Sequence, residues 1–478
     1  MRTCDTRSVR LVLALALAGC YGPVVPTGAP CTTETDCPRE LVCDRGHCER
    51  EGSEIDASVL IDAPMTIDGN PSCTCASDST ITCNSGPSMT CALGCLMQDD
   101  GARCAEITPS NGVVVALVGI TTTISIGADT TFDTGTGAIT GGVTRAAGSG
   151  VSAGIGYEQR LFGNGAQLGV FTFRTLIVAP DATVQLSGPR SAVFVVGTTA
   201  TISGTISARA GCATDRSCAG PGGGVGATLT VAAGCGPGGN GQSDPNDMTG
   251  GDGGGAGGGG GAIGGAGGSA GPWFGGTGGI ACLTADNEPL VGGSGGGGGG
   301  PGNLDATPPR GGGGGGAFQL TALDRIVVTG TIISGGAGGA GGLGGVTSVA
   351  NASAGSGGGA GGAILLEAPV VDVAAGSVLA ANGGGGGGGG IFSVSGEAGQ
   401  DGGANAVPAA GGAPASGATR GGSGGAAMTA AGTAGDAPSD RNAGGGGGAV
   451  GRIYVRALQP AIAGTVSPPA GTGPLRTH

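Results

Sequence analysis

The stretch GGAFQLTALDRIVVTGTIISGG at residues 315–336 decides the fold, because the stretch GGAILLEAPVVDVAAGSVLAANGG at residues 361–384 repeats its pattern. The apolar run that begins at Ala317 recurs at Ala363, 46 residues on, and the two segments align without a gap. Repetition at a fixed spacing with one apolar face is typical of a solenoid, whose units are too thin to fold alone and stack on their neighbours. We therefore expect a repeated architecture.

Six shorter segments between residues 113 and 206 read as strands. They are rich in Val, Ile and Thr, the β-branched types that pack well on a pleated surface, and glycine turns such as Gly204 interrupt them. A helix is disfavoured because glycine and β-branched residues are poor helix formers. Strand, tight turn and strand in units of about twenty residues predict an all-β fold, a right-handed parallel β-helix (β-solenoid). The predicted strands are 113–118, 122–126, 171–178, 183–186, 193–196 and 199–206.

Glycine provides 117 of the 478 residues, and from about residue 211 it forms long tracts such as 311–316 and 383–390. These insertions should leave the solenoid at equivalent corners. One interpretation is that they are flexible loops, as glycine-rich segments generally are. The other is that they run side by side as polyproline-II-like strands that hydrogen-bond laterally, because no side chains hold the backbones apart. We favour at least partial ordering; collagen is excluded because glycine is not spaced strictly every third residue.

Composition limits the classes of protein to which this chain can belong. Aromatic residues make up 3% and charged residues 11% of the chain, so a conventional core of Phe, Leu and Trp is not expected. The mean hydropathy of +0.22 argues against disorder throughout. The net charge is −13. Nucleic acid is therefore not an expected partner, because its binding requires clustered positive charge.

Several kinds of site lack the residues that they need. Lysine is absent, which removes Schiff-base chemistry and the phosphate-loop lysine. The two histidines, His47 and His478, lie outside the glycine-rich region, so no Ser-His-Asp triad or histidine-bound metal is expected there. We interpret the one acidic cluster in the tracts as a solvated loop, with a single calcium ion as the alternative, and we expect neither cofactor nor metal. That cluster consists of Asp244, Asn246, Asp247 and Asp252.

The first 19 residues have the features of a signal peptide. Three arginines precede an apolar stretch at residues 11–17, which is too short to span a membrane as a helix. Residues 17–20 read Leu-Ala-Gly-Cys and resemble the lipobox of bacterial lipoproteins. The resemblance implies cleavage before Cys20 and acylation of that cysteine, so that the membrane becomes a partner through the lipid anchor. The alternative is an ordinary signal peptide with an incidental cysteine.

The residues after Cys20 bear on the location. No Asp follows the cysteine directly, since positions 21 and 22 are Tyr21 and Gly22. In the lipoproteins that this segment resembles, an acidic residue there favours retention in the inner membrane. We therefore expect an exported protein at the outer membrane or cell surface, held by a tether at residues 20–30.

Fourteen cysteines remain after Cys4 and Cys20 are set aside, and even clusters in an exported protein indicate disulfides. The first cluster, within a module at residues 31–49, resembles the small cysteine-rich repeats of exported bacterial surface proteins. Its four cysteines allow three connectivities, and zinc with His47 is the alternative. The cluster comprises Cys31, Cys37, Cys43 and Cys48.

Two more cysteine clusters follow an acidic linker at residues 50–72. A module at residues 73–105 is too small to fold on apolar burial alone, so three disulfides should stabilise it. We interpret this module as a rigid spacer rather than as a partner-binding or protease-inhibiting unit. Two further disulfides should pin the glycine-rich insertions. The cysteines concerned are Cys73, Cys75, Cys83, Cys91, Cys95 and Cys104 in the module, and Cys212, Cys218, Cys235 and Cys282 in the insertions.

The repeats at residues 192–211, 315–336, 361–384 and 447–458 resemble those of glycine-rich, β-helical surface proteins of Gram-negative bacteria. The resemblance covers roughly residues 170–468. It implies the fold and the location and carries no catalytic motif. We divide the body into N-terminal coils at residues 106–210, a glycine-rich β-helix at 211–468 and a flexible tail at 469–478.

An enzyme acting on polysaccharides is the alternative function, because parallel β-helices include such lyases and hydrolases. These enzymes need carboxylates, with or without Arg, gathered on one face. Aligning the repeats places Asp324 opposite Val370 and Arg325 opposite Val371, so the charges do not recur at matched positions. The four charged candidates, Asp324, Arg325, Glu367 and Asp372, are interpreted as scattered surface charges.

The function that the sequence favours is a non-enzymatic, lipid-anchored surface protein with a structural or adhesive role. Glycans or other surface proteins are the expected partners. Trp273 and Phe274, the sole tryptophan and its neighbour, are our candidate for ligand contact, because aromatic side chains stack on sugars or anchor partners. The alternative is that this pair caps a coil or packs one insertion.

Overall fold

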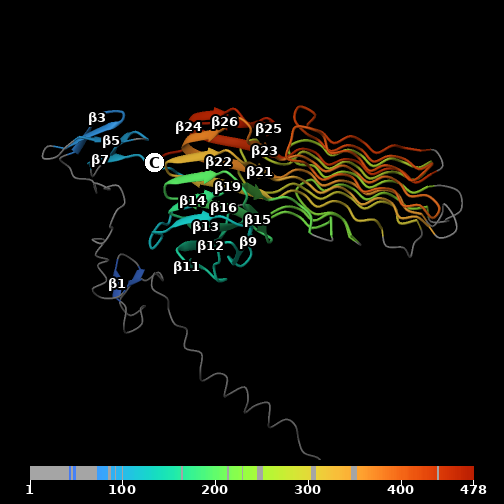
Figure 1. The fold of residues 1–478 in the computed structure, drawn as a ribbon, viewed down its shortest axis with the longest axis horizontal. Coiled ribbons are helices and arrows are strands. Elements are labelled where there is room, and N and C mark those ends of the chain that lie inside the picture. Colours follow the sequence, from blue (N-terminus) through green and yellow to red (C-terminus); the bar gives the residue numbers. More distant parts are fainter. Residues whose placement is uncertain are drawn as a thin grey trace, which may run out of the picture. The chain divides into compact units, whose positions relative to one another are not determined.

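The computed structural model describes residues 42–44, 47–49, 73–83, 88–91, 93–98, 101–162, 165–212, 215–228, 230–244, 251–302, 308–345, 352–438 and 441–478. The chain divides into two compact units, Met1–Asn70 and Pro71–His478. In the first, β1 (Val42–Asp44) pairs antiparallel with β2 (His47–Glu49), with Cys43 opposite Cys48 (Figure 1). The predicted signal peptide, Cys20, the tether, Cys31, Cys37 and the acidic linker lie outside the described residues.

The six-cysteine module consists of short antiparallel strands joined by three disulfides. Its strands are β3 (Cys73–Ser77), β4 (Thr80–Cys83), β5 (Met89–Thr90), β6 (Cys95–Gln98) and β7 (Gly101–Cys104). The bridges join Cys73 to Cys83, Cys75 to Cys95 and Cys91 to Cys104. The predicted disulfides of this cluster are confirmed, and the structure supplies the connectivity.

The body is built from two large, curled and mostly parallel sheets, and no helix occurs among the described residues. The smaller sheet contains β10 (Ile139–Gly141), β9 (Thr130–Asp133), β15 (Thr183–Ser187), β18 (Thr205–Ser207), β21 (Thr331–Ile333), β23 (Val378–Ala380) and β25 (Thr465–Ser467). The larger sheet contains β11 (Gly150–Ser152), β12 (Ile155–Leu161), β13 (Gln167–Phe173), β16 (Ser191–Val196), β19 (Ala317–Ala322), β22 (Ala363–Val373), β20 (Arg325–Val328), β17 (Thr199–Ile202), β14 (Thr175–Val178), β8 (Thr123–Ile126), β24 (Arg452–Ile462) and β26 (Gly471–Gly473). This all-β arrangement is compatible with a solenoid.

The glycine-rich insertions leave the sheets at one repeated position in the strand order. Each begins after a strand of the smaller sheet, β18, β21 or β23, and ends at a strand of the larger sheet, β19, β22 or β24. These three exit strands pair in parallel with one another, as do the three return strands. Exit from equivalent corners is therefore confirmed.

The register of the repeat differs from the gapless alignment. Ala317 pairs with Ala363 as predicted, but Arg325 lies opposite Val370 rather than Val371. One residue is missing at the corner because Pro369 alone replaces Leu323 and Asp324 there. The next turn is longer in the second repeat, so that Thr331 pairs with Val378.

Some predicted strands are confirmed and others are wrong. The segments at 122–126, 183–186 and 193–196 are strands, whereas 171–178 and 199–206 each divide into two strands at a corner. Residues 113–118 form no strand; Val113 instead packs on the outer side of the larger sheet against Leu290 and Leu365. The antiparallel strands β9 to β12 at the start of the body were not predicted.

A cluster of phenylalanines fills the core near the start of the body. The rings of Phe171 and Phe194 lie 5.8 Å apart, and Phe194 contacts Phe318 of the following strand set edge to face at 5.2 Å. Phe132 and Phe173 complete the cluster, and all five side chains are fully buried. The prediction that no phenylalanine core can form is therefore wrong for this end, although Val, Ile, Leu and Ala dominate the rest.

The glycine tracts are ordered and joined to one another by backbone hydrogen bonds, and they run side by side in Figure 1. Tract 352–362 donates in a cycle of three: residues 353, 356 and 359 to tract 334–343; 354, 357 and 360 to tract 291–300; 355, 358 and 361 to tract 441–451. Its carbonyls accept from tracts 381–390, 308–316 and 251–260. A cycle of three residues is the geometry of polyproline II, which makes no hydrogen bonds within itself. The predicted lateral ordering is confirmed, and the flexible-loop interpretation is wrong for these tracts.

Glycine is required where the tracts touch. A Cβ added to Gly357 would overlap the carbonyl oxygen of Ala256 in a neighbouring tract, well inside the closest approach of real Cβ atoms. The core of this region therefore consists of backbone packed on backbone, in which buried N–H groups donate to carbonyls of neighbouring tracts. Disulfides Cys212–Cys218 and Cys235–Cys282 pin the insertions as predicted.

Residues 469–478, the predicted flexible tail, are tied down instead. Strand β26 pairs with β24, and the backbone N–H and carbonyl groups of His478 bond those of Glu106. Within the described part of the chain, no helix is long and apolar enough to cross a membrane.

Candidate binding surface

Three glycine tracts form an outer layer in which every third residue faces solvent. Tract 274–280 reads Phe-Gly-Gly-Thr-Gly-Gly-Ile, and Phe274, Thr277 and Ile280 are exposed. Because polyproline II has three residues per turn, the two glycines between them must face two neighbouring tracts. Added Cβ atoms at Gly275 and Gly278 would meet tract 263–269, and those at Gly276 and Gly279 would meet tract 236–239 and its neighbours.

The two flanking tracts follow the same rule. In tract 263–269, Ile263 and Ala266 are exposed and Ser269 is half-buried. In tract 236–243, Pro237 and Asn240 are exposed at this spacing and Ser243 is half-buried, while Gln242 departs from the spacing and is exposed. Hydrogen bonds fix the three tracts to each other: the N–H of Gly264 donates to Gly279, and that of Gly239 donates to Thr277. We call the outward row the glycine-tract face. It comprises Pro237, Asn240, Ser243, Ile263, Ala266, Ser269, Phe274, Thr277 and Ile280.

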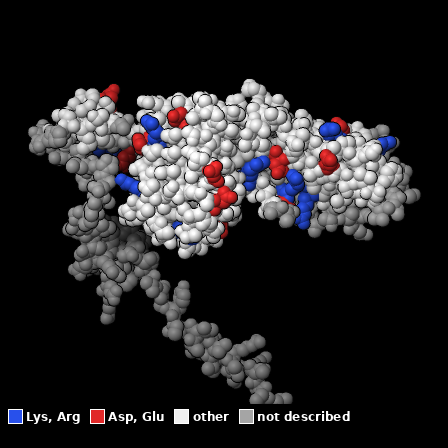
Figure 2. Space-filling model, viewed as in Figure 1, with Lys and Arg blue, Asp and Glu red and all other residues white. Residues whose placement is uncertain are grey.

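The glycine-tract face is uncharged and partly apolar. None of its nine residues is charged. Phe274 and Ile280 are each 65% exposed and Ile263 is 59% exposed. Another part of the tracts carries Glu397, Gln400 and Asp401, and Asp401 forms an ion pair with Arg216 at 2.8 Å. The visible surface in Figure 2 likewise shows few charged side chains, gathered in small groups.

The predicted ligand-contact pair, Trp273 and Phe274, lies at the turn that begins tract 274–280. Trp273 forms a two-way backbone bridge with Ala270 and is half-buried, so it shapes this turn. Phe274 is exposed, and its N–H donates to the Gln242 side chain. The structure therefore separates the pair into a packed residue and an exposed one. Sequence reasoning missed Thr277, Ile280 and Ile263, which the Gly-Gly-x spacing would have found.

The four charged residues considered for an enzyme do not gather. Asp324 is exposed and accepts a hydrogen bond from Thr199 at 2.9 Å, whereas Glu367 is 1% exposed. Arg325 on β20 is exposed and Asp372 on the adjacent strand β22 is partly exposed, two positions along in the register. Among the described residues, no group of three His, Cys, Asp or Glu side chains could hold a metal ion.

Glu367 instead belongs to a closed polar cluster on the outer side of the larger sheet. Ser110 donates to it from the covering segment, and Gln319 and Thr321 donate from β19 at 2.8 Å each. Arg456 Nε lies 3.7 Å from the carboxylate. Burial raises the pKa of Glu367, while the hydrogen bonds from Ser110 and Thr321 and the charge of Arg456 act in the opposite direction. The prediction that Glu367 is a surface charge is wrong.

The same cluster ties distant parts of the chain to the sheet. Arg456 pairs with Asp286 at 3.2 Å and Glu288 at 3.4 Å, and Arg476 pairs with Glu288 at 2.6 Å. Solvent has little access to Arg456, which is 5% exposed. Buried charges that pair and bond internally hold segments together, and this cluster offers a substrate no entrance.

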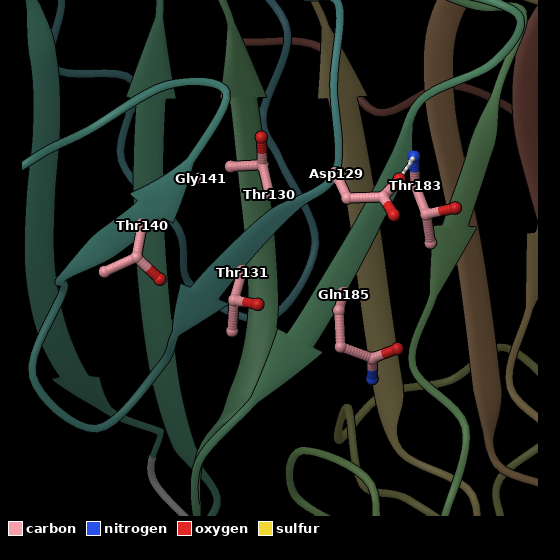
Figure 3. A pocket seen from close by; sticks show the side chains of 7 residues that line it. All are labelled: Asp129, Thr130, Thr131, Thr140, Gly141, Thr183 and Gln185. Atoms are coloured by element: carbon pink, nitrogen blue, oxygen red, sulfur yellow. Dashed lines mark hydrogen bonds between the residues drawn. The ribbon is translucent and has the colours of Figure 1, made fainter.

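A shallow polar hollow of about 420 Å³ lies on the smaller sheet. Thr140, Thr131 and Gln185 line it from three adjacent strands in register, and Asp129 lies at its side (Figure 3). The Asp129 carboxylate accepts a hydrogen bond from the Thr183 N–H at 2.9 Å, which fixes its orientation. Hydroxyl, amide and carboxylate groups can bond a hydroxylated ligand, but a single carboxylate provides no acid and base pair for glycoside hydrolysis.

The acidic cluster considered for calcium is bonded internally where it is described. The N–H of Asp244 donates to the Asp252 carboxylate at 2.9 Å, and the N–H of Asp252 donates to the Asn442 side chain at 2.7 Å. Asp244 and Asp252 are both buried, so the interpretation of a solvated loop is wrong for these two. Asn246 and Asp247 lie outside the described residues.

Comparison of the chain with protein families, with curated proteins and with solved structures finds no match. The assignment of function therefore depends on the chemistry of the surface itself.

Proposed function

We propose that this chain is a non-enzymatic, surface-exposed lipoprotein with a structural or adhesive role at the cell envelope. The observation that carries the proposal is the glycine-tract face, an uncharged surface with exposed Phe274, Ile263 and Ile280 on a hydrogen-bonded backbone. An exposed aromatic side chain such as that of Phe274 offers a large area for contact with a partner. A backbone fixed by its neighbours loses little conformational entropy when it binds.

The proposed body is a right-handed parallel β-helix that displays this face. The chain forms sets of three consecutive strands, of which the first two belong to the larger sheet and the third to the smaller sheet. These sets are β13, β14 and β15, then β16, β17 and β18, then β19, β20 and β21. Each set pairs in parallel with the next. Stacked sets of this kind hold long insertions at one corner without disturbing the core.

Export and anchoring complete the proposal. Five disulfides among the described cysteines suit an oxidising compartment outside the cytoplasm. The lipobox-like sequence at residues 17–20 supports Cys20 as the proposed site of lipidation. Acylation by more than one chain anchors a protein stably, and the disulfide modules then act as the spacer between the membrane and the body.

One experiment tests both the location of the protein and its adhesion. Full-length protein and a Cys20→Ala variant are produced in a Gram-negative host and fractionated, and intact mass is measured. We expect acylated protein in the outer membrane and release of the variant. The released variant is then assayed for retention on cells and immobilised glycans, and for turnover of acidic polysaccharides. Retention of the protein on cells or glycans without turnover of polysaccharide supports the proposal. Turnover of polysaccharide contradicts it, as does a released variant that neither binds cells or glycans nor assembles.

A further inference from the structure

We propose that the glycine-tract face is a self-association surface on which the same face of a second copy of this chain docks. The inference rests on the proposed structural or adhesive function and names the partner. It requires only the exposed rows on tracts 236–243, 263–269 and 274–280.

The face exposes apolar side chains whose burial against a partner is favourable. Phe274 and Ile280 are each 65% exposed and Ile263 is 59% exposed, and adjacent hydrogen-bonded tracts carry them. Removing such side chains from water is favourable by about 25 cal/mol for each Å² that is buried. Half-buried Trp273 lies beside Phe274 at the end of the same row and adds aromatic surface. Tryptophan is enriched among the few residues that dominate the binding energy of interfaces.

The spacing of the outward side chains matches that of a second copy of the same face. Three residues of polyproline II rise about 9.3 Å, so Phe274, Thr277 and Ile280 project at that interval, with two glycines between each pair. The gaps are open to the depth of the backbone and can receive side chains from a partner. An α-helix repeats about every 5.4 Å and a strand face about every 6.6 Å, so neither stays in step with these gaps. A second polyproline-II tract with a side chain at every third residue has the same spacing as these gaps. The same face of another copy of this chain provides such a tract.

The distribution of charge also favours contact through this face. The chain carries a net charge of −13, so two copies repel each other through most orientations. None of the nine residues of the glycine-tract face is charged. Contact between these nine residues therefore pairs no like charges, and the nearest charged side chain on the adjoining tract is that of exposed Asp436. Docking of one face on its own copy is the isologous contact of a two-fold dimer, which closes and leaves no repeating fibre.

The test measures self-association of the full-length Cys20→Ala protein by sedimentation at increasing concentration, alongside two variants. Ile280→Asp places a charge on the middle one of the three tracts of the proposed contact. Val407→Asp is the matched control, because Val407 is also 65% exposed and lies outside the face. We expect a monomer–dimer equilibrium whose dissociation constant rises at least tenfold in Ile280→Asp and is unchanged in Val407→Asp. Equal thermal midpoints of the two variants confirm that the fold is intact.

A second variant distinguishes loss of this contact from a general loss of non-specific association. Phe274→Asp is predicted to weaken the dimer as Ile280→Asp does, since both residues lie on one row. A protein that remains monomeric from the micromolar to the millimolar range overturns the inference, as does equal weakening by Val407→Asp. A monomer that still adheres to cells or glycans overturns the self-association and leaves the adhesive function standing. A face-dependent dimer that does not adhere supports the inference and limits the function to a structural role.

Discussion

Gly297→Ala is predicted to destabilise the packed glycine tracts, whereas Gly298→Ala, the adjacent substitution, is not. The added Cβ at Gly297 would lie about 1 Å inside the 3.0 Å that real Cβ atoms respect, against the carbonyl oxygen of Gly239. At Gly298 the nearest heavy atom, the carbonyl oxygen of Pro309, would be 3.3 Å away. The two residues are neighbours in one buried tract, so they form a matched pair.

The expected loss of stability follows from the hydrogen bonds that the added methyl group would break. Gly238 donates to Gly295, and Gly241 donates to Gly298; these bonds join the two tracts that the new methyl group would push apart. Each broken bond that leaves a buried group unsatisfied costs about 1–3 kcal/mol, and the loss of glycine returns about 0.4–1 kcal/mol through the unfolded chain. We therefore expect about 3 kcal/mol of net destabilisation for Gly297→Ala and a change within about 1 kcal/mol for Gly298→Ala.

The assay is denaturant unfolding of both variants, together with hydrogen exchange at tract 236–243. Gly297→Ala should lower the midpoint and expose amides of that tract, while Gly298→Ala should do neither. Equal stability of the two variants would refute the inference that the tracts pack backbone on backbone, because only the added methyl group's location distinguishes them.

Three other predictions test the core, the disulfides and the buried carboxylate. Phe194→Ala should cost about 3–5 kcal/mol in denaturant unfolding because this ring contacts four others; a cost below that of an exposed control such as Phe392→Ala would contradict the phenylalanine core. Replacing Cys235 and Cys282 by Ser, a pair 47 residues apart, should lower stability by about 4 kcal/mol, against about 2 kcal/mol for Cys212 and Cys218, 6 residues apart; the reverse order would contradict the pinning role. The raised pKa of Glu367 means that the folded state holds this proton more tightly, so its contribution is fully present below the ordinary value of 4.5 and is lost as pH rises through the folded-state pKa; Glu367→Gln should remove that slope from a pH series of unfolding free energies, and exposed Glu397→Gln should keep it.

The repeat made the sheets predictable because apolar periodicity and spacing are local properties of the sequence. The pairing of Ala317 with Ala363 followed directly. The register at the next corner did not, because a turn absorbs an extra or missing residue without disturbing the strands on either side. Pro369 stands alone where the preceding repeat has Leu323 and Asp324, and a gapless alignment cannot show this.

The lateral order of the glycine tracts was predicted. The position of each tract within the layers was not predicted, although the sequence contains the pattern that indicates it. Unbroken glycine, as at 383–390, marks a tract with neighbours on every side, since no side chain fits. The pattern Phe-Gly-Gly-Thr-Gly-Gly-Ile marks a tract with one free side. Glycine does not recur strictly every third residue along the whole chain, so this period of three is visible only within single tracts.

The Glu367 cluster was beyond sequence reasoning for a different reason. Its members Ser110 and Glu367 are separated by 257 residues, and no periodicity connects them. The covering segment near Val113 resembles a strand because its residues are β-branched, yet tertiary packing places it against the outside of a sheet. Local propensity cannot distinguish a strand within a sheet from an extended segment that covers one.

Hydrogen–deuterium exchange of tract 352–362 tests the central claim most directly. Its amides donate to three neighbouring tracts and its carbonyls accept from three others, so the account predicts protection comparable to that of strand β22, which it enters at Ala363. Exchange of these amides as fast as in an unfolded glycine peptide would contradict the ordered layer, and with it the glycine-tract face.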